Sequence, residues 1–90
     1  MSENAPGGVL NLIVRTADQT RKNGIEIDPQ SQCGEIVEGA VREWRLPVDT
    51  DYTLINVTQG NAQLNPQHTL VQAGVREGDT LEIQPVLVAG

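Results

Sequence analysis

The stretch that decides the fold is Thr69-Leu-Val-Gln-Ala-Gly-Val-Arg-Glu-Gly-Asp-Thr-Leu-Glu-Ile-Gln-Pro-Val-Leu-Val-Ala-Gly90. It predicts a tight turn in which Gly74 takes a left-handed conformation, then a last strand beginning at Thr80 and a short tail. Pro85 has no backbone N–H, so the hydrogen-bonded ladder of this strand is expected to end near it. The tail then runs to Gly90, which has no side chain to hinder attack on its carboxyl carbon.

Two strands are predicted at the other end of the chain. Residues 9–15 are rich in branched aliphatic side chains, and residues 25–27 alternate apolar and polar. Between them, Asn23-Gly24 is a strong turn signal. The pattern therefore predicts a hairpin with its turn at these two residues.

A helix follows the hairpin. Asp28-Pro29 and Ser31 are residues typical of helix starts, and Pro47 is expected to end the helix near Leu46. After it, residues 52–58 predict a strand, Gly60-Asn61 a turn and residues 62–64 a short return strand. The apolar face of the helix has spacings of three and four residues and consists of Cys33, Ile36, Val37, Ala40, Val41 and Trp44.

Ninety residues are enough for a single domain. The predicted order of elements gives an α+β fold, in which one helix packs across one face of a mixed sheet of four to five strands. We expect residues 1–8 to be a disordered leader, residues 9–85 the folded domain and residues 86–90 a flexible tail.

Composition argues against several classes of function. The net charge of −6 opposes binding to nucleic acid or to an anionic membrane. The start of the chain lacks the pattern of a signal peptide, so we expect a cytoplasmic protein. Cys33 and His68 are the only cysteine and histidine, which leaves no cluster for a metal. Cys33 fits the core and His68 a loop, so we expect no cofactor and no enzymatic activity.

Several phrases of the sequence resemble the ubiquitin-like (β-grasp) family. The spacing from Gln63-Leu64 through Thr69-Leu70 and Thr80-Leu-Glu-Ile to a six-residue tail is similar to ubiquitin's own. The phrase Gln-Ala-Gly-Val-Arg-Glu-Gly-Asp-Thr-Leu-Glu-Ile resembles that of small bacterial ubiquitin-like proteins. Some of these are encoded beside activating and conjugating enzymes, and others at type VII secretion loci. The resemblance implies the β-grasp fold over residues 9–90.

The resemblance also implies a function for the tail. In a protein modifier of this family, Gly90 would be the acyl donor, activated by an ATP-dependent enzyme and conjugated to protein targets. Val86, Leu87, Val88 and Ala89 would be recognised by the activating and conjugating enzymes, and by a deconjugating peptidase. Two alternatives remain open. One is a non-covalent interaction module of the type VII secretion kind, and the other is a sulfur carrier with a thiocarboxylate at Gly90.

Three differences from ubiquitin concern partners. Ala89 stands where ubiquitin has the first glycine of its Gly-Gly end. The positions of ubiquitin's apolar recognition patch are expected to fall on Thr58 and Gln84, with Glu82 beside them, which predicts a polar partner face. Lys22 is the only lysine, so polymers linked through a lysine would have to use it.

Overall fold

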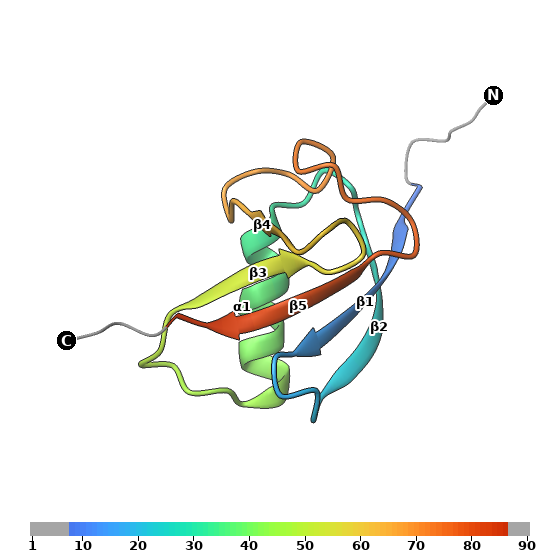
Figure 1. The fold of residues 1–90 in the computed structure, drawn as a ribbon. Helices are drawn as coiled ribbons and strands as arrows, with labels where there is room; N and C mark the ends of the chain where they lie inside the picture. Colours follow the sequence, from blue (N-terminus) through green and yellow to red (C-terminus); the bar gives the residue numbers. More distant parts are fainter. Residues whose placement is uncertain (1–7, 87–90) are drawn as a thin grey trace.

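The computed structural model describes residues 8–86, which form five strands and one α-helix (Figure 1). The strands make one mixed sheet and the helix crosses one face of it, so the predicted α+β architecture is confirmed. The elements are β1 (Leu10–Thr16), β2 (Lys22–Ile27), α1 (Cys33–Trp44), β3 (Tyr52–Asn56), β4 (Ala62–Leu64) and β5 (Thr80–Pro85).

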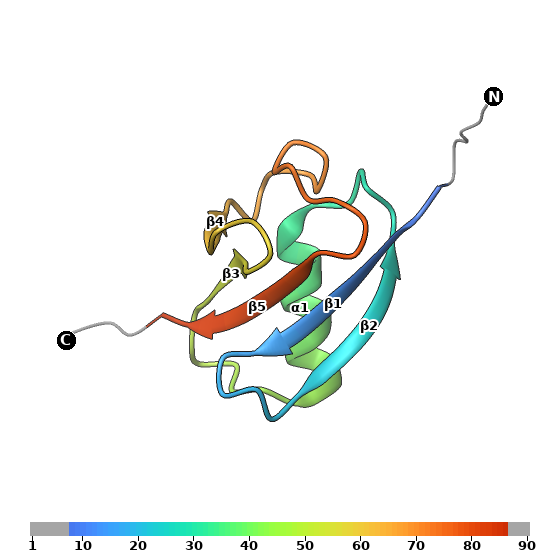
Figure 2. The same cartoon turned by 45° about the vertical axis from the view of Figure 1, so that its right-hand side comes forward.

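The first and last strands lie side by side in the sheet. The strand order is β2-β1-β5-β3-β4, in which β1 and β5 are parallel and every other neighbouring pair is antiparallel. Figure 2 shows β5 between β1 and β3. Residues 17–79 therefore form one long connection between two central strands, and the sheet is complete only when β5 takes its place.

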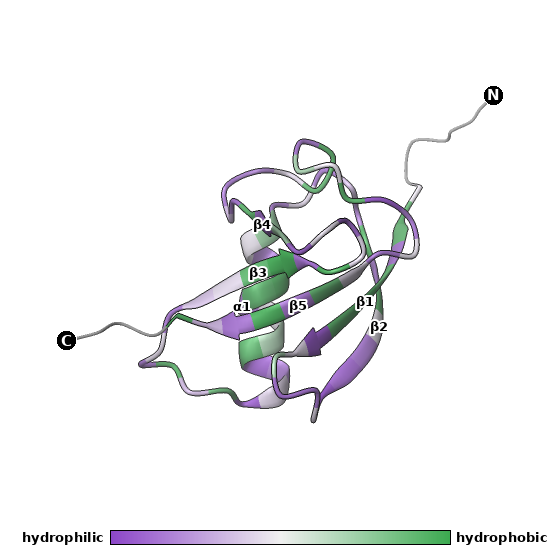
Figure 3. Cartoon of the chain, in the orientation of Figure 1, coloured by the Kyte–Doolittle hydropathy of each residue, from purple (hydrophilic) through white to green (hydrophobic). Residues whose placement is uncertain are grey.

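The hydrophobic core lies between the sheet and α1. Leu12, Leu81 and Ile83 from the central strands are at most 2% exposed, and Cys33 and Ile36 meet them from the helix. Figure 3 shows hydrophobic residues gathered in the central strands and along α1. Removing these side chains from water supplies the main driving force for folding, at about 25 cal/mol per Å² of apolar surface. Five residues of the predicted apolar face of the helix pack in this core, whereas the sixth, Val41, is half-buried outside it.

Both ends of α1 differ from the prediction. Gln32 is the N-cap, and its N–H donates to the Glu35 carboxylate at 2.9 Å, whereas Asp28 belongs to a turn before the helix. The helix ends at Trp44, two residues earlier than expected. Arg45 adopts a left-handed conformation with φ 53°, and the N–H of Leu46 turns back to the carbonyl of Val41 at 3.0 Å.

The hairpin turn is also displaced from its predicted position. Asn23-Gly24 lies inside β2, where Gly24 is paired with Ile13, and the turn spans residues 17–20. One carboxylate oxygen of Asp18 accepts hydrogen bonds from the Thr16 hydroxyl at 2.6 Å and from the Thr20 N–H at 3.0 Å. A carboxylate that caps its own backbone in this way fixes a tight turn, so Asp18 decides where the hairpin reverses.

β3 is shorter than predicted, and this changes where one candidate residue lies. The strand stops at Asn56, so Thr58 falls in the following turn rather than on the strand. That turn runs through Gly60 and Asn61, both with positive φ, which confirms the predicted turn there. Gly74 has φ 77°, as its place in the turn before β5 predicted.

Candidate functional site

The end of β5 fixes the point from which the C-terminal segment departs. Pro85 is paired with Tyr52, and the N–H of Val86 donates to the carbonyl of Asp51 at 2.8 Å. The hydroxyl of Tyr52 donates in turn to the carbonyl of Pro47 at 2.8 Å, which ties this corner to the loop after α1. The strand ends at Pro85 as predicted, and Val86 is already 42% exposed.

The other residues of the predicted tail site lie outside the described residues. These are Leu87, Val88, Ala89 and the candidate acyl donor Gly90. The structure defines the point from which they start, at the corner where β5 ends and β3 begins. Because Val86 is held by a backbone hydrogen bond, this starting point is set by the sheet itself.

A second candidate surface is the face of the sheet opposite α1, with Glu82 near its middle. Glu82 is 9% exposed, and both of its carboxylate oxygens are occupied. Arg15 Nε donates to Oε1 at 2.9 Å, and Gln84 Nε2 donates to Oε2 at 2.6 Å. The structure therefore brings Glu82 and Gln84 together with Arg15, a residue that sequence reasoning had not included.

Thr58 does not lie directly beside Glu82. Its hydroxyl oxygen accepts a hydrogen bond from the N–H of Thr80 at 2.8 Å, at the start of β5. The β3 residue opposite Glu82 is Ile55. On β3 it is therefore Ile55 that lies beside Glu82, and Thr58 belongs to the turn that follows the strand.

The face of the sheet opposite α1, here called the open face, therefore contains hydrophobic side chains as well as polar ones. Ile13 and Ile55 are half-buried and lie outside the core cluster, on the strands that flank β5. Alternation along a strand could have identified both, because Leu12 and Leu54 next to them point into the core. A face with two isoleucines around an Arg15–Glu82 pair can offer a partner both apolar and charged contacts.

The candidate acceptor Lys22 lies on a different edge of the sheet. It is the first residue of β2, rather than a loop residue, and it is exposed. Its neighbour across the strands is Arg15. An exposed amine at a sheet edge is accessible to an incoming acyl group.

Cys33 and His68 do not form a catalytic pair. Cys33 is fully buried, and burial raises the pKa of its thiol, which disfavours the nucleophilic thiolate. His68 is an exposed loop residue whose backbone carbonyl accepts the Cys33 N–H at 2.8 Å. Residues 8–86 also hold no group of three His, Cys, Asp or Glu side chains placed to bind a metal ion. The helix they contain is not of the length and hydrophobicity needed to cross a membrane.

The fold of this sheet and helix is similar to that of ubiquitin. A ubiquitin from Caldiarchaeum subterraneum superimposes with a TM-score of 0.74, at 23% identity, over 92% of this chain and 100% of that one. A protein designed from ubiquitin gives a TM-score of 0.73 at 22% identity, over 94% of this chain and 99% of that one.

A third solved structure extends the likeness to a domain of a larger protein. The C-terminal ubiquitin-like domain of mouse tubulin-specific chaperone e gives a TM-score of 0.70 at 14% identity, over 100% of this chain and 99% of that domain. No family model and no curated protein matches the sequence. The chain therefore has the ubiquitin-like fold, and its activity has to be argued from its own residues.

Proposed function

We propose that this chain is a ubiquitin-like protein modifier that acts through the carboxylate of Gly90. The observation that carries the proposal is the fixed departure point at Val86, whose N–H is held by Asp51 at 2.8 Å at the end of a central strand. An arm that starts from a rigid corner can be placed accurately in the groove of an enzyme, because the domain supplies the orientation. The ubiquitin-like fold supports the same assignment.

The chemistry belongs to the partners. An activating enzyme joins the Gly90 carboxylate to the AMP part of ATP and releases pyrophosphate. A cysteine thiolate then displaces AMP to give a thioester, and a target amine displaces the thiolate to give an amide. This chain supplies the carboxylate and the recognition of residues 86–89. Conjugating enzymes and a deconjugating peptidase are further partners, and Lys22 is the acceptor for chains of modifiers.

The test is to incubate the protein with ATP and candidate activating enzymes encoded near its gene, and to measure intact masses. We expect an adduct at the enzyme cysteine that hydroxylamine cleaves, because thioesters react with it. Removing Gly90 should abolish the adduct, whereas Val48→Ala, a change at an exposed loop residue, should leave it intact. A protein that gives no adenylate, thioester or amide with any of these enzymes would refute the modifier function.

The open face of the sheet favours a second candidate function, that of a non-covalent interaction module. Ile13 and Ile55 flank Arg15 and Glu82 there, as described above. Under this function Ile55→Arg should abolish capture of a partner while removal of Gly90 has no effect. A sulfur carrier is less favoured, because Ala89 replaces the first glycine of the usual pair. A bacterial, cytoplasmic origin fits all three and is part of the proposal.

A further inference from the structure

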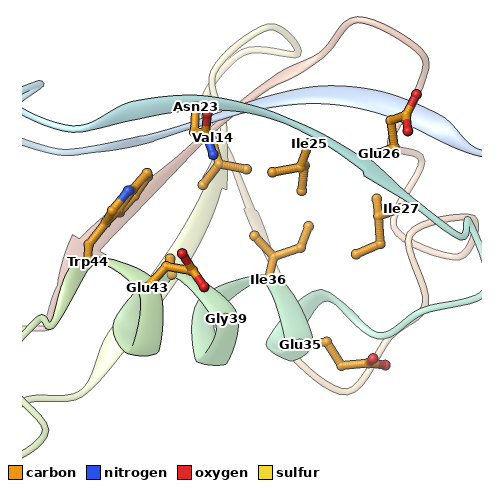
Figure 4. A pocket seen from close by; sticks show the side chains of 11 residues that line it. Val14, Asn23, Ile25, Glu26, Ile27, Glu35, Ile36, Gly39, Glu43 and Trp44 are labelled. Carbon is orange, nitrogen blue, oxygen red and sulfur yellow. The ribbon is translucent and has the colours of Figure 1, made fainter.

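A hollow of about 690 Å³ lies between the second half of α1 and the loop that joins the helix to β3. It is on the side of α1 away from β2, whereas Figure 4 shows the β2 side, where Ile36 and Trp44 line a smaller hollow. Val37 and Val41 line the larger hollow from the helix, and Tyr52 lines it from β3. Val41 is half-buried and lies outside the core cluster, so part of its apolar surface is left open.

The loop beside this hollow presents a hydrophobic side chain to solvent. Val48 lines the hollow next to Pro47 and is 89% exposed, more than any other large hydrophobic residue that the structure describes. Single exposed valines are common on protein surfaces, but one at the rim of an apolar hollow extends a patch of the kind that marks interaction sites. The projecting side chain and the hollow therefore belong to one surface.

The charges around the hollow have opposite signs on its two walls. Arg42 and Arg45 line the helix wall, whereas Asp51 lines the loop wall, with Asp49 two residues before it. All four are exposed, and within residues 8–86 none of them is in an ion pair. Glu38 is also on the helix wall, one turn before Arg42, and the two arginines outweigh its charge. The two walls are thus complementary in charge to each other.

A two-fold axis close to Val48 brings these features into contact between two copies of the chain. In a two-fold dimer both copies use the same surface, so every contact is made twice. The helix wall of one copy then faces the loop wall of the other, and arginines meet aspartates. Val48 of each copy enters the hollow of its partner near Val41. Because the projection and the hollow lie on one surface, the assembly closes at two copies and does not grow into a filament.

We propose that the chain forms a symmetric dimer through this surface, here called the helix–loop surface. The surface is small, so we expect a weak association with a dissociation constant of about 100 µM. The dimer and the proposed conjugation use different groups, since the side chain of Asp51 takes part here and its carbonyl holds Val86. The residues that form the helix–loop surface are Val41, Arg42, Arg45, Val48, Asp49 and Asp51.

The first experiment is sedimentation velocity of the full chain between about 10 µM and 1 mM, a range that brackets the expected dissociation constant. We expect the sedimentation coefficient to rise with concentration toward that of a dimer. Val48→Asp places a charge in the partner's hollow and should weaken the association at least about tenfold. The matched control is Val71→Asp, because Val71 is also exposed and lies outside the helix–loop surface. It should associate like the natural sequence.

Charge exchange between the two walls tests the two-fold arrangement. Arg42→Glu with Arg45→Glu makes both walls acidic, and Asp49→Arg with Asp51→Arg makes both walls basic. Each of these double variants alone should associate at least about tenfold more weakly, because like charges then face each other. An equimolar mixture of the two should recover the association, since every contact again joins opposite charges.

A control variant separates this effect from that of net charge. Arg21→Glu with Lys22→Glu changes the net charge by the same amount as the acidic variant, at exposed residues of the hairpin outside the helix–loop surface. Alone, it should associate within about threefold of the natural sequence. Circular dichroism checks that each variant is folded.

Three outcomes would overturn the proposal. They are a chain that stays monomeric at 1 mM, equal effects of Val48→Asp and Val71→Asp, and no recovery in the mixture of the acidic and basic variants. Removing Gly90 should leave the dimer unchanged, whereas Val48→Asp should leave conjugation unchanged. A failure of this proposal can therefore be told apart from a failure of the modifier function.

Discussion

Asp79 is the residue that joins the loop before β5 to the end of β3. It is 4% exposed, and its Oδ2 accepts hydrogen bonds from Asn56 Nδ2 at 2.9 Å, Gln59 Nε2 at 2.7 Å and the Arg76 N–H at 2.9 Å. Burial by itself raises the pKa of Asp79. The three hydrogen bonds and the nearby Arg76 charge outweigh it, so the pKa lies below the ordinary 3.8. The network is a partly buried polar cluster, with Asn56 and Asp79 inside and Gln59 and Arg76 at the surface.

Removing one donor from this network should destabilise the domain. Asn56 is 1% exposed, and its side chain also accepts the Gln59 N–H at 3.3 Å. We expect Asn56→Ala to lower the free energy of unfolding by about 2 kcal/mol, because Asp79 and the Gln59 N–H each lose a partner. Urea unfolding followed by circular dichroism measures this. Gln67→Ala, at an exposed loop residue, is the control and should change little.

Acid should destabilise the domain through the same residue. A carboxyl whose pKa is lowered by folding stabilises the fold above its unfolded pKa, and this contribution is lost as pH falls through its folded pKa. Asp79 and Asp18 both have lowered values, the latter about 2 because the Thr16 hydroxyl and the Thr20 backbone donate to it. We therefore expect unfolding free energy to fall between about pH 4 and pH 2.

The matched variant for the acid experiment is Asp79→Asn. We expect this variant to be less stable than the natural sequence at neutral pH, and its unfolding free energy to fall less between pH 4 and pH 2. Denaturant curves at several pH values give both slopes. If the unfolding free energies of the two proteins fall equally between pH 4 and pH 2, Asp79 does not contribute to the acid sensitivity.

At the scale of elements, prediction from sequence succeeded where hydrophobic periodicity was strong. The face of α1 and the strands β1 and β5 were found because buried side chains there repeat with a fixed period. The hairpin turn was placed wrongly, because the local preference of Asn23-Gly24 competed with Asp18, whose carboxylate satisfies the backbone of the actual turn. Which of the two turns forms depends on hydrogen bonds made in the folded structure, and these cannot be read from local residue preferences.

In the candidate site, too, local features could be predicted from sequence and long-range ones could not. The end of the ladder near Pro85 was predictable, because the missing N–H of proline is a local property. The neighbours of Glu82 were not, because they depend on how three separate strands align. The strand predicted over residues 52–58 stops at Asn56, so Ile55 and not Thr58 is the β3 neighbour of Glu82. Register between distant strands is therefore the part of this fold that sequence reasoning determined least.

Two glycines of α1 should respond in opposite ways to the same substitution. Gly39→Ala adds a Cβ into open space and should stabilise the domain by about 0.5 to 1 kcal/mol, since alanine favours helix. At Gly34 the same Cβ would lie 3.1 Å from the Pro66 carbonyl oxygen, which also accepts the Gly34 N–H. Gly34→Ala should therefore stabilise less or destabilise. Thermal unfolding of the pair measures the difference.

At the scale of the whole molecule, stability should depend sharply on where the chain stops. A chain that stops after Val86 retains β5 and the hydrogen bond to Asp51, so we expect its melting temperature to stay within about 3 °C of that of the full chain. A chain that stops before Thr80 lacks Leu81 and Ile83, which are at most 1% exposed in the central strand. It should not fold. Circular dichroism melting curves of the two proteins test this, and cooperative unfolding of the shorter one would contradict it.

The central place of β5 has a consequence for biosynthesis. A ribosome makes β1 before β5, yet the neighbour that β1 needs on its inner side is β5, which emerges after the other four described strands. Until then the nascent domain exposes Leu12 and Leu54 to chaperones and proteases. Prematurely terminated chains remain in that exposed condition. The residues after Val86 can therefore be presented to enzymes only by molecules in which β5 has already been synthesised.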